Sequence, residues 1–142
     1  MPGSGNSRHP VLQHVMETLK RLEKELQEIE RILNEWGFAS IEYKRVFVRT
    51  DGLPMFYLRA WTKAHYLHVE GMIIENELRC YCKLTRSERN KHSHKDEIIG
   101  WDNLYNDRPH VHFNEDARRE YRQERIEWEE IRSVIEGMEA RR

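Results

Sequence analysis

The sequence predicts an α+β fold in which a long helix, an antiparallel sheet of about five strands and a second long helix follow one another. An apolar heptad repeat opens the chain, short segments rich in β-branched and aromatic residues fill its middle, and a second apolar stripe lies near its end. With 142 residues the chain is long enough for one domain and too short for two well-packed ones. We therefore expect a single domain, residues 1–142, with helices only at its two ends.

The first helix is expected over residues 10–36, after a flexible tail at residues 1–9. Its apolar positions alternate in steps of three and four, which is the heptad seam of a coiled coil. These positions are Leu12, Val15, Leu19, Leu22, Leu26, Ile29, Leu33 and Trp36. The seam either packs on the sheet of the same subunit or joins two copies in a homodimer. The second alternative arises because a helix of this length exceeds what five short strands can cover.

Residues 39–104 are expected to form the sheet. Asp51-Gly52 is a strong hairpin signal, Glu75-Asn76 is a weaker one, and a further strand follows the polar stretch 85–96. The expected strands are Ser40–Arg49, Met55–Thr62, Ala64–Ile74, Glu77–Leu84 and Glu97–Leu104. Sequential hairpins make an antiparallel meander, which commonly has one packed face and one wet face.

The second helix is expected over residues 114–140. Asn114 is a plausible N-cap, and the acidic Glu115 and Asp116 favour a first helical turn. The apolar stripe consists of Ala117, Tyr121, Trp128, Ile131, Ile135 and Met138.

Composition excludes several classes of protein. The sequence has no apolar stretch of about 20 residues and no apolar run near its first residues, so we expect a cytoplasmic protein with no membrane partner. No Walker-type phosphate loop, Gly-x-Ser-x-Gly elbow or dinucleotide fingerprint is present, which leaves nucleotide hydrolases, serine esterases and dehydrogenases without support. We expect no cofactor.

The net charge of −1 conceals one locally basic segment at residues 83–95. Its cations are Lys83, Arg86, Arg89, Lys91 and Lys95. Such a cluster is typical of contacts with nucleic-acid phosphates, although a solvated charged loop explains it equally well.

The segment 98–113 contains the residues that are best suited to catalysis or ligand binding. In an extended strand His110 and His112 share a face, so that the two imidazoles can act together as acid and base. Arg108 is a candidate phosphate ligand, and Asp102 is a candidate for orienting an imidazole. The alternative is that Asp102 forms a turn and that the histidines only precede a helix.

Cys80 and Cys82 are too few and too close for a disulfide framework. They can complete a zinc site with His92 and His94, or with His110 and His112. The Cys-x-Cys spacing is a weak zinc signal, and two small residues facing the core account for it more simply.

An aromatic-Asp-Asn triplet at a strand end, followed by a Pro-His-x-His element, resembles the TumE-like toxin family of prokaryotic toxin–antitoxin systems. The matching residues are Trp101-Asp102-Asn103 and Pro109-His110-Val111-His112, and the likeness covers residues 64–113. The chain differs from the family pattern in that Leu104-Tyr105 intervenes and Gly100 precedes the triplet. The resemblance implies a small growth-inhibiting protein that acts on RNA and is neutralised by a cognate antitoxin.

A function of a different class is also compatible with the sequence. The chain can be a noncatalytic interaction module whose heptad helix pairs with itself or with a partner. In that case assembly depends on apolar seam positions such as Leu19 and Leu26, and the histidines are dispensable.

Overall fold

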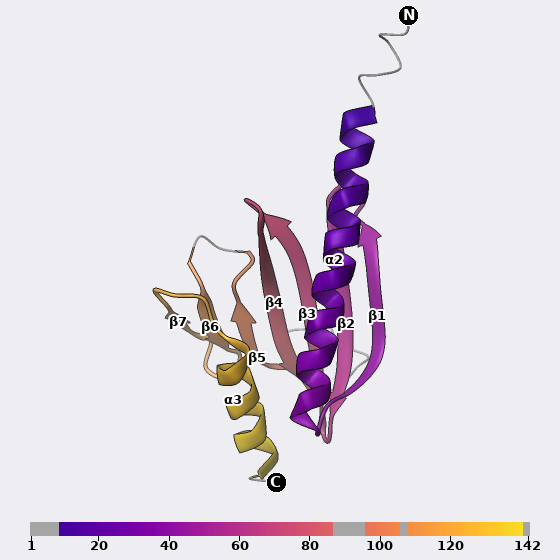
Figure 1. The fold of residues 1–142 in the computed structure, drawn as a ribbon. Helices are drawn as coiled ribbons and strands as arrows, with labels where there is room; N and C mark the ends of the chain where they lie inside the picture. The colour runs from indigo at the N-terminus through magenta and orange to yellow at the C-terminus, as the bar shows by residue number, and fades with distance from the viewer. Residues whose placement is uncertain (1–8, 87–95, 106–107, 141–142) are drawn as a thin grey trace, which may run out of the picture.

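The computed structural model describes residues 9–86, 96–105 and 108–140. A long helix, a seven-stranded sheet and a shorter helix follow one another along the chain (Figure 1). The elements are α2 (His9–Trp36), β1 (Ser40–Val48), β2 (Pro54–Thr62), β3 (His65–Ile74), β4 (Glu77–Thr85), β5 (Glu97–Asp102), β6 (His110–Phe113), β7 (Arg118–Tyr121) and α3 (Trp128–Ala140). The predicted α+β class is confirmed.

The sheet is an antiparallel meander in which each strand pairs with the next, in the order β1 to β7. Both predicted hairpin turns are present. Gly52 has a φ of 88°, and its amide donates to the carbonyl of Arg49 at 2.9 Å. Glu75 and Asn76 have φ values of 52° and 65°, the two positive angles that a type I′ turn needs.

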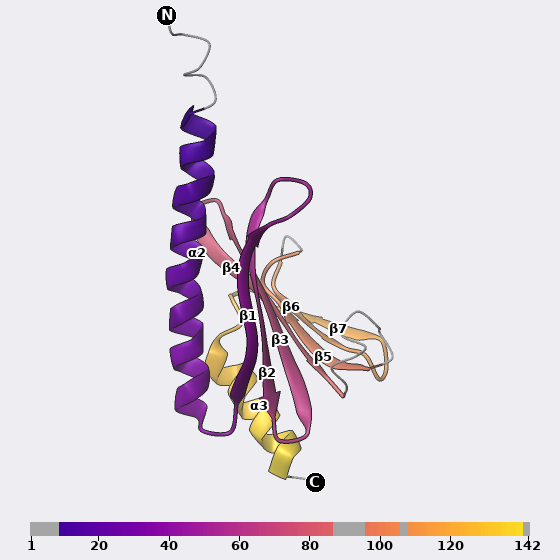
Figure 2. The same cartoon turned by 90° about the vertical axis from the view of Figure 1, so that its right-hand side faces the viewer.

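Both helices lie on the same face of the sheet (Figures 1 and 2). Alternate residues of the strands point toward them, and together they form one apolar core. The fully buried members include Leu22, Ile29 and Leu33 of α2, Phe56, Leu58, Val69, Trp101 and Val111 of the sheet, and Ile135 of α3.

The heptad seam of α2 divides into two halves. From Leu22 to Trp36 the seam is buried against the sheet, whereas its first position, Leu12, is 61% exposed, and the flanking apolar residues Val11 and Met16 are 64% and 58% exposed. Helix length explains this division: 28 residues extend about 42 Å, while a nine-residue strand extends about 30 Å. The first turns of α2 therefore project beyond the sheet, as Figure 1 shows. Neither described helix is long and apolar enough to span a membrane.

The prediction of a helix over residues 114–140 is wrong in its first half. Residues 118–121 form β7, which pairs with β6, and the helix begins only at Trp128. Ala117, which was placed on the helical stripe, has a φ of 55° in the turn before β7. Without β7, the amides and carbonyls of β6 would be left unpaired at an open edge of the sheet. The free energy gained by hydrogen bonding between β6 and β7 exceeds the preference of residues 118–121 for a helix. The sheet accordingly extends past residue 104 and gains two strands.

A glycine in β3 makes room for the ring of Phe56 in the apolar core. Gly71 is the cross-strand neighbour of Phe56, and a Cβ at Gly71 would lie 2.2 Å from the Phe56 ring. We predict that Gly71→Ala lowers the free energy of unfolding by about 1–3 kcal/mol, because the fully buried ring has no free space to enter. Urea unfolding measures this loss.

A double variant tests the cause. Phe56→Leu replaces the ring by a smaller aliphatic side chain that lacks the clashing atoms, so Gly71→Ala is expected to cost less in that background than in the wild type. Equal costs in both backgrounds would contradict the assigned clash.

Candidate functional site

The face of the sheet opposite the helices carries two complete cross-strand rows of polar and aromatic residues. The register places one residue of each row on every strand. The first row is Arg45, Tyr57, Glu70, Tyr81, Asp102, His110 and Tyr121, and the second is Tyr43, Arg59, His68, Lys83, Gly100, His112 and Arg119. We call these the polar rows. Neither contains an aliphatic side chain, unlike the core row Leu58, Val69, Cys82, Trp101 and Val111 behind them.

His112 forms a closed three-residue cluster with Glu97 and Tyr81. Nδ1 of His112 lies 3.3 Å from Glu97 Oε2, and Nε2 lies 3.2 Å from the Tyr81 hydroxyl oxygen. The same hydroxyl donates to Glu97 Oε1 at 2.7 Å. Because the Tyr81 proton is directed to Glu97, the phenol oxygen is left to accept a proton from His112 Nε2. The arrangement thus holds the imidazole of His112 at both of its nitrogens.

The cluster keeps Glu97 ionised although its side chain is only 4% exposed. Burial raises the pKa of Glu97, but hydrogen bonds from His112 and Tyr81, with the positive charges of His112 and Lys83, bring the pKa below its ordinary value of 4.5. Burial and the Glu97 carboxylate raise the pKa of Tyr81 far above its ordinary value. Tyr81 is therefore a hydrogen-bond donor in this cluster and not a nucleophile.

Gly100 creates the space that His112 occupies. The two residues are cross-strand neighbours, and a Cβ at Gly100 would lie 2.5 Å from Cε1 and 2.6 Å from Nε2 of the imidazole. It would also lie 3.1 Å from the Tyr81 ring. Any other residue at this position would displace the imidazole from Glu97 and Tyr81, so Gly100 is a positioning residue for the cluster.

His110 lies beside this cluster and is almost fully enclosed, with 1% of its side chain exposed. Its ring centroid is 5.4 Å from those of both His112 and Tyr121. Nε2 is 3.8 Å from Asp102 Oδ2, and Nδ1 is 3.4 Å from the carbonyl oxygen of Arg108. The exposed Arg108 guanidinium lies 5.5 Å from the Tyr121 ring centroid. The structure thus brings all four predicted catalytic residues into one region.

The Trp101-Asp102-Asn103 triplet also has structural roles. Trp101 is part of the apolar core. Asp102 Oδ1 accepts the amides of Leu104 and Tyr105 at 2.7 and 2.8 Å, which makes the turn after β5. The Asn103 amide exchanges two hydrogen bonds of 3.0 Å with the backbone of Ile126 and fixes the segment before α3. Only the second oxygen of Asp102 faces the histidine pair.

The predicted basic segment is described only in part. Lys83 belongs to the second polar row, and Arg86 is exposed just after β4. The other predicted phosphate contacts, Arg89, Lys91 and Lys95, lie outside the described residues.

The cysteines do not join the histidines of β6. Cys80 and Cys82 pack in the core on the helix-covered face, as the simpler of the two interpretations expects, whereas His110 and His112 lie on the opposite face, so these four residues do not form the alternative zinc site. Burial raises the pKa of Cys80 to about 12 and that of Cys82 well above its ordinary value, which disfavours the thiolates that zinc binds. The alternative partners His92 and His94 lie outside the described residues. Among residues that the structure describes, no group of three His, Cys, Asp or Glu side chains forms a metal position.

The sequence does not identify two members of the cluster, Tyr81 and Glu97, or the positioning residue Gly100. Tyr81 is the residue between the two cysteines, and strand alternation there predicts that it faces away from the core. The partners of His112 depend on the pairing of β4, β5 and β6, including a register shift between Leu84 and Thr85. No local pattern reveals that pairing.

Comparisons with protein-family models, with curated proteins and with solved structures found no match to the chain.

The lowered pKa of Glu97 predicts a pH dependence of stability. A carboxyl whose pKa is lowered by folding stabilises the fold fully above its unfolded value, near 4.5, and this contribution is lost as the pH falls through the folded value. We predict that Glu97→Gln lowers the free energy of unfolding by about 1–3 kcal/mol at neutral pH, and that this difference shrinks below about pH 4.5.

Urea unfolding of both proteins between about pH 3 and pH 7 measures this difference. Tyr81→Phe removes one hydrogen bond to Glu97 and is expected to move the acid loss of stability to higher pH. A difference between wild type and Glu97→Gln that is constant with pH would contradict the assignment.

Proposed function

We propose that the chain is a toxin-like protein that acts on RNA at the face of its sheet opposite the helices and is neutralised by a cognate antitoxin. One observation carries the proposal: two imidazoles, each facing a buried carboxylate, lie 5.4 Å apart between ring centroids on this face. Paired imidazoles held by carboxylates are suited to general acid–base chemistry near neutral pH. The motif resemblance to TumE-like toxins supports the same class of target.

The proposed reaction is cleavage of the RNA backbone by its own 2′-hydroxyl. A base removes the hydroxyl proton, the 2′-oxygen forms a bond to phosphorus, and the bond from phosphorus to the 5′-oxygen breaks. An acid supplies the proton that this leaving oxygen needs, so the products are a 2′,3′-cyclic phosphate and a 5′-hydroxyl. His112 and His110 provide the acid and the base, and Arg108 contacts the phosphate.

The accessibility of the two imidazoles assigns them different positions in the site. His112 is 21% exposed and is the imidazole that substrate reaches first, by replacing the Tyr81 hydroxyl at Nε2. His110 is enclosed beneath Tyr121, whose own ring is half exposed. Substrate reaches His110 through movement of the Tyr121 and Arg108 side chains at the end of β7 and the start of β6.

Replacement of His112 tests this function. Expression of the chain alone is expected to degrade cellular RNA and slow growth, and His112→Ala is expected to lower RNA cleavage by about 10²–10⁴-fold because proton transfer is lost. His110→Ala is expected to act in the same direction. Gly100→Ala, which retains both imidazoles but displaces His112, is expected to lower cleavage as well.

His65→Ala is the matched control. His65 Nδ1 also faces a buried carboxylate, Glu139 at 3.2 Å, but on the helix-covered side of the sheet. This variant therefore loses a comparable His–carboxylate pair and is expected to keep its activity. RNA integrity that is identical in wild type and His112→Ala would exclude catalysis at this site.

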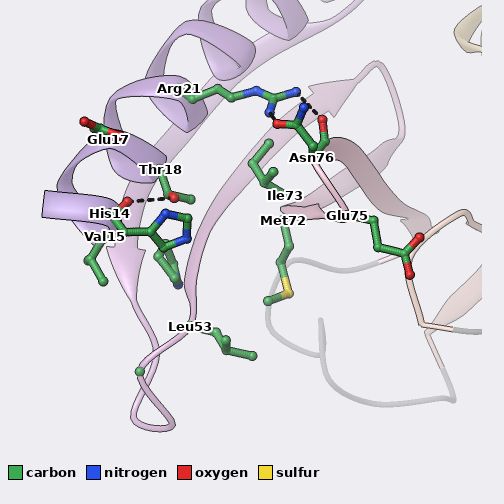
Figure 3. Close-up of a pocket in the computed structure, with 12 residues that line it drawn as sticks. His14, Val15, Glu17, Thr18, Arg21, Leu53, Met72, Ile73, Glu75 and Asn76 are labelled. Atoms are coloured by element: carbon green, nitrogen blue, oxygen red, sulfur yellow. Dashed lines mark hydrogen bonds between the residues drawn. The ribbon is translucent and has the colours of Figure 1, made fainter. Parts of the chain in front are cut away.

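A second candidate function is self-association through the first turns of α2, which project beyond the sheet. The Arg21 guanidinium donates hydrogen bonds to the side-chain and backbone oxygens of Asn76 at 2.8 and 2.9 Å. On the N-terminal side of Arg21 the helix separates from the sheet (Figure 3). A pocket of about 500 Å³ lies between the helix and the β1–β2 and β3–β4 turns, with Leu53 and Met72 among its lining residues. The exposed Leu12 and Met16 continue the same face, and the partner that fits a continuing heptad seam is α2 of a second copy.

Glutamates at exposed apolar positions in the first turns of α2 test this association. Leu12→Glu with Met16→Glu is expected to convert a dimer into a monomer at micromolar concentration, as measured by light scattering, because the apolar contact is replaced by repelling charges. Both positions are solvent-exposed, so the fold is expected to remain intact. Leu26 is not suitable for this test, since it is buried in the core of its own subunit.

Lys20→Glu with Lys24→Glu introduces the same number of glutamates at exposed positions of α2 outside the seam and serves as the control. A wild-type chain that is monomeric at these concentrations would eliminate this candidate.

A further inference from the structure

The face of the sheet opposite the helices contains a pocket near its β1 edge, separate from the histidine cluster. Its volume is about 340 Å³, and it opens to solvent between the first three strands. Its lining residues are Tyr43, Arg45, Phe47, Met55, Tyr57, Arg59 and Glu70. Five of these residues belong to the polar rows, so the pocket and the histidine cluster share one surface.

The pocket combines aromatic rings with guanidinium groups. The rings of Tyr43 and Tyr57 lie 5.9 Å apart between centroids, and Tyr43 is 40% exposed. The Arg45 guanidinium lies 4.9 Å from the Phe47 centroid, and that of Arg59 lies 5.7 Å from the Tyr43 centroid. A planar ligand that carries negative charge matches this lining, since rings and guanidinium planes stack on it while the guanidinium hydrogens bind the anion.

A continuous series of contacts leads from this pocket to the histidine cluster. Glu70, which lines the pocket, accepts a hydrogen bond from the Tyr105 hydroxyl. The Tyr105 ring packs edge-on against Tyr81, with centroids 5.6 Å apart, and Tyr81 contacts His112. From β2 to β6 the sheet spans four strand spacings, about 19 Å, which corresponds to five or six nucleotides at about 3.4 Å per stacked nucleotide.

We propose that this pocket binds one nucleotide of a single-stranded RNA, with the base against Tyr43 and Tyr57 and a phosphate on Arg45. The inference rests on the proposed action on RNA and extends it: the pocket holds the strand several nucleotides from the bond that is cleaved at His112. Base stacking on tyrosine tolerates all four bases, so the site contributes affinity with little sequence preference.

Binding of a fluorescein-labelled hexauridylate, measured by fluorescence anisotropy with the full chain, tests the pocket. Tyr43→Ala and Arg45→Ala are each expected to weaken binding about tenfold. Tyr43→Phe keeps the ring and is expected to bind within about twofold of the wild type. Lys44→Ala removes a cation of the same strand that faces α2, where Lys44 pairs with Glu30, and is expected to leave binding unchanged.

Two results would contradict the proposed nucleotide site. One is that Arg45→Ala and Lys44→Ala weaken hexauridylate binding equally, which indicates unspecific attraction between charges. The other is that Tyr43→Ala binds hexauridylate as tightly as the wild type. Thermal unfolding of each variant confirms that the fold is retained. Binding and cleavage test the two proposals separately.

If binding depends on the pocket residues but the chain cleaves no RNA, the nucleotide site is supported and the proposed reaction is rejected. If the chain cleaves RNA and Tyr43→Ala leaves this cleavage unchanged, the reaction is supported and the nucleotide site is rejected.

Discussion

The pairing register of β4, β5 and β6 is the constraint on which the rest of the structure depends. It aligns Cys82, Trp101 and Val111 on the face covered by the helices and Tyr81, Asp102 and His110 on the opposite face. Because strand side chains alternate with a period of two, a slip by one residue would place the carboxylate and the imidazole in the apolar core. The fully buried Trp101 ring excludes such a slip, so the hydrophobic core determines the geometry of the polar rows.

The same sheet shows how ionisable groups are retained in a largely enclosed environment. Glu97 is stable there as a carboxylate because His112 and Tyr81 both donate to it. The three side chains contact one another pairwise, so removal of any one of them leaves the other two with one partner fewer. Gly100 is the condition for this arrangement, since only a residue without Cβ leaves room for the imidazole. Packing and hydrogen bonds thus hold the imidazole in one position, which is the preorganisation that the proposed acid–base role requires.

One sequence pattern in this protein has two structural outcomes. The seam of α2 is uniform in its heptad spacing, yet Leu22 and Leu33 are fully buried in the core while Leu12 is solvent-exposed. The difference is geometric: the helix is longer than the strands beneath it, so its first turns pass beyond the sheet. Apolar periodicity therefore predicts the helix and its buried stripe, but not the surface that covers each part of the stripe.

Sequence alone determined the elements whose signals are local. The bounds of α2, the turns at Asp51-Gly52 and Glu75-Asn76, and the shared face of His110 and His112 follow from heptad spacing, turn chemistry and strand alternation. Tertiary structure decided what depends on distant partners. It converted residues 118–121 from the expected helix into a strand that pairs with β6, it placed the cysteines on the far side of the sheet from these histidines, and it brought Glu97 and Tyr81 to His112. The physical reason is that hydrogen-bond pairing between strands and the packing of a common core join residues far apart in sequence, and their free energy exceeds the local preferences that a short segment expresses.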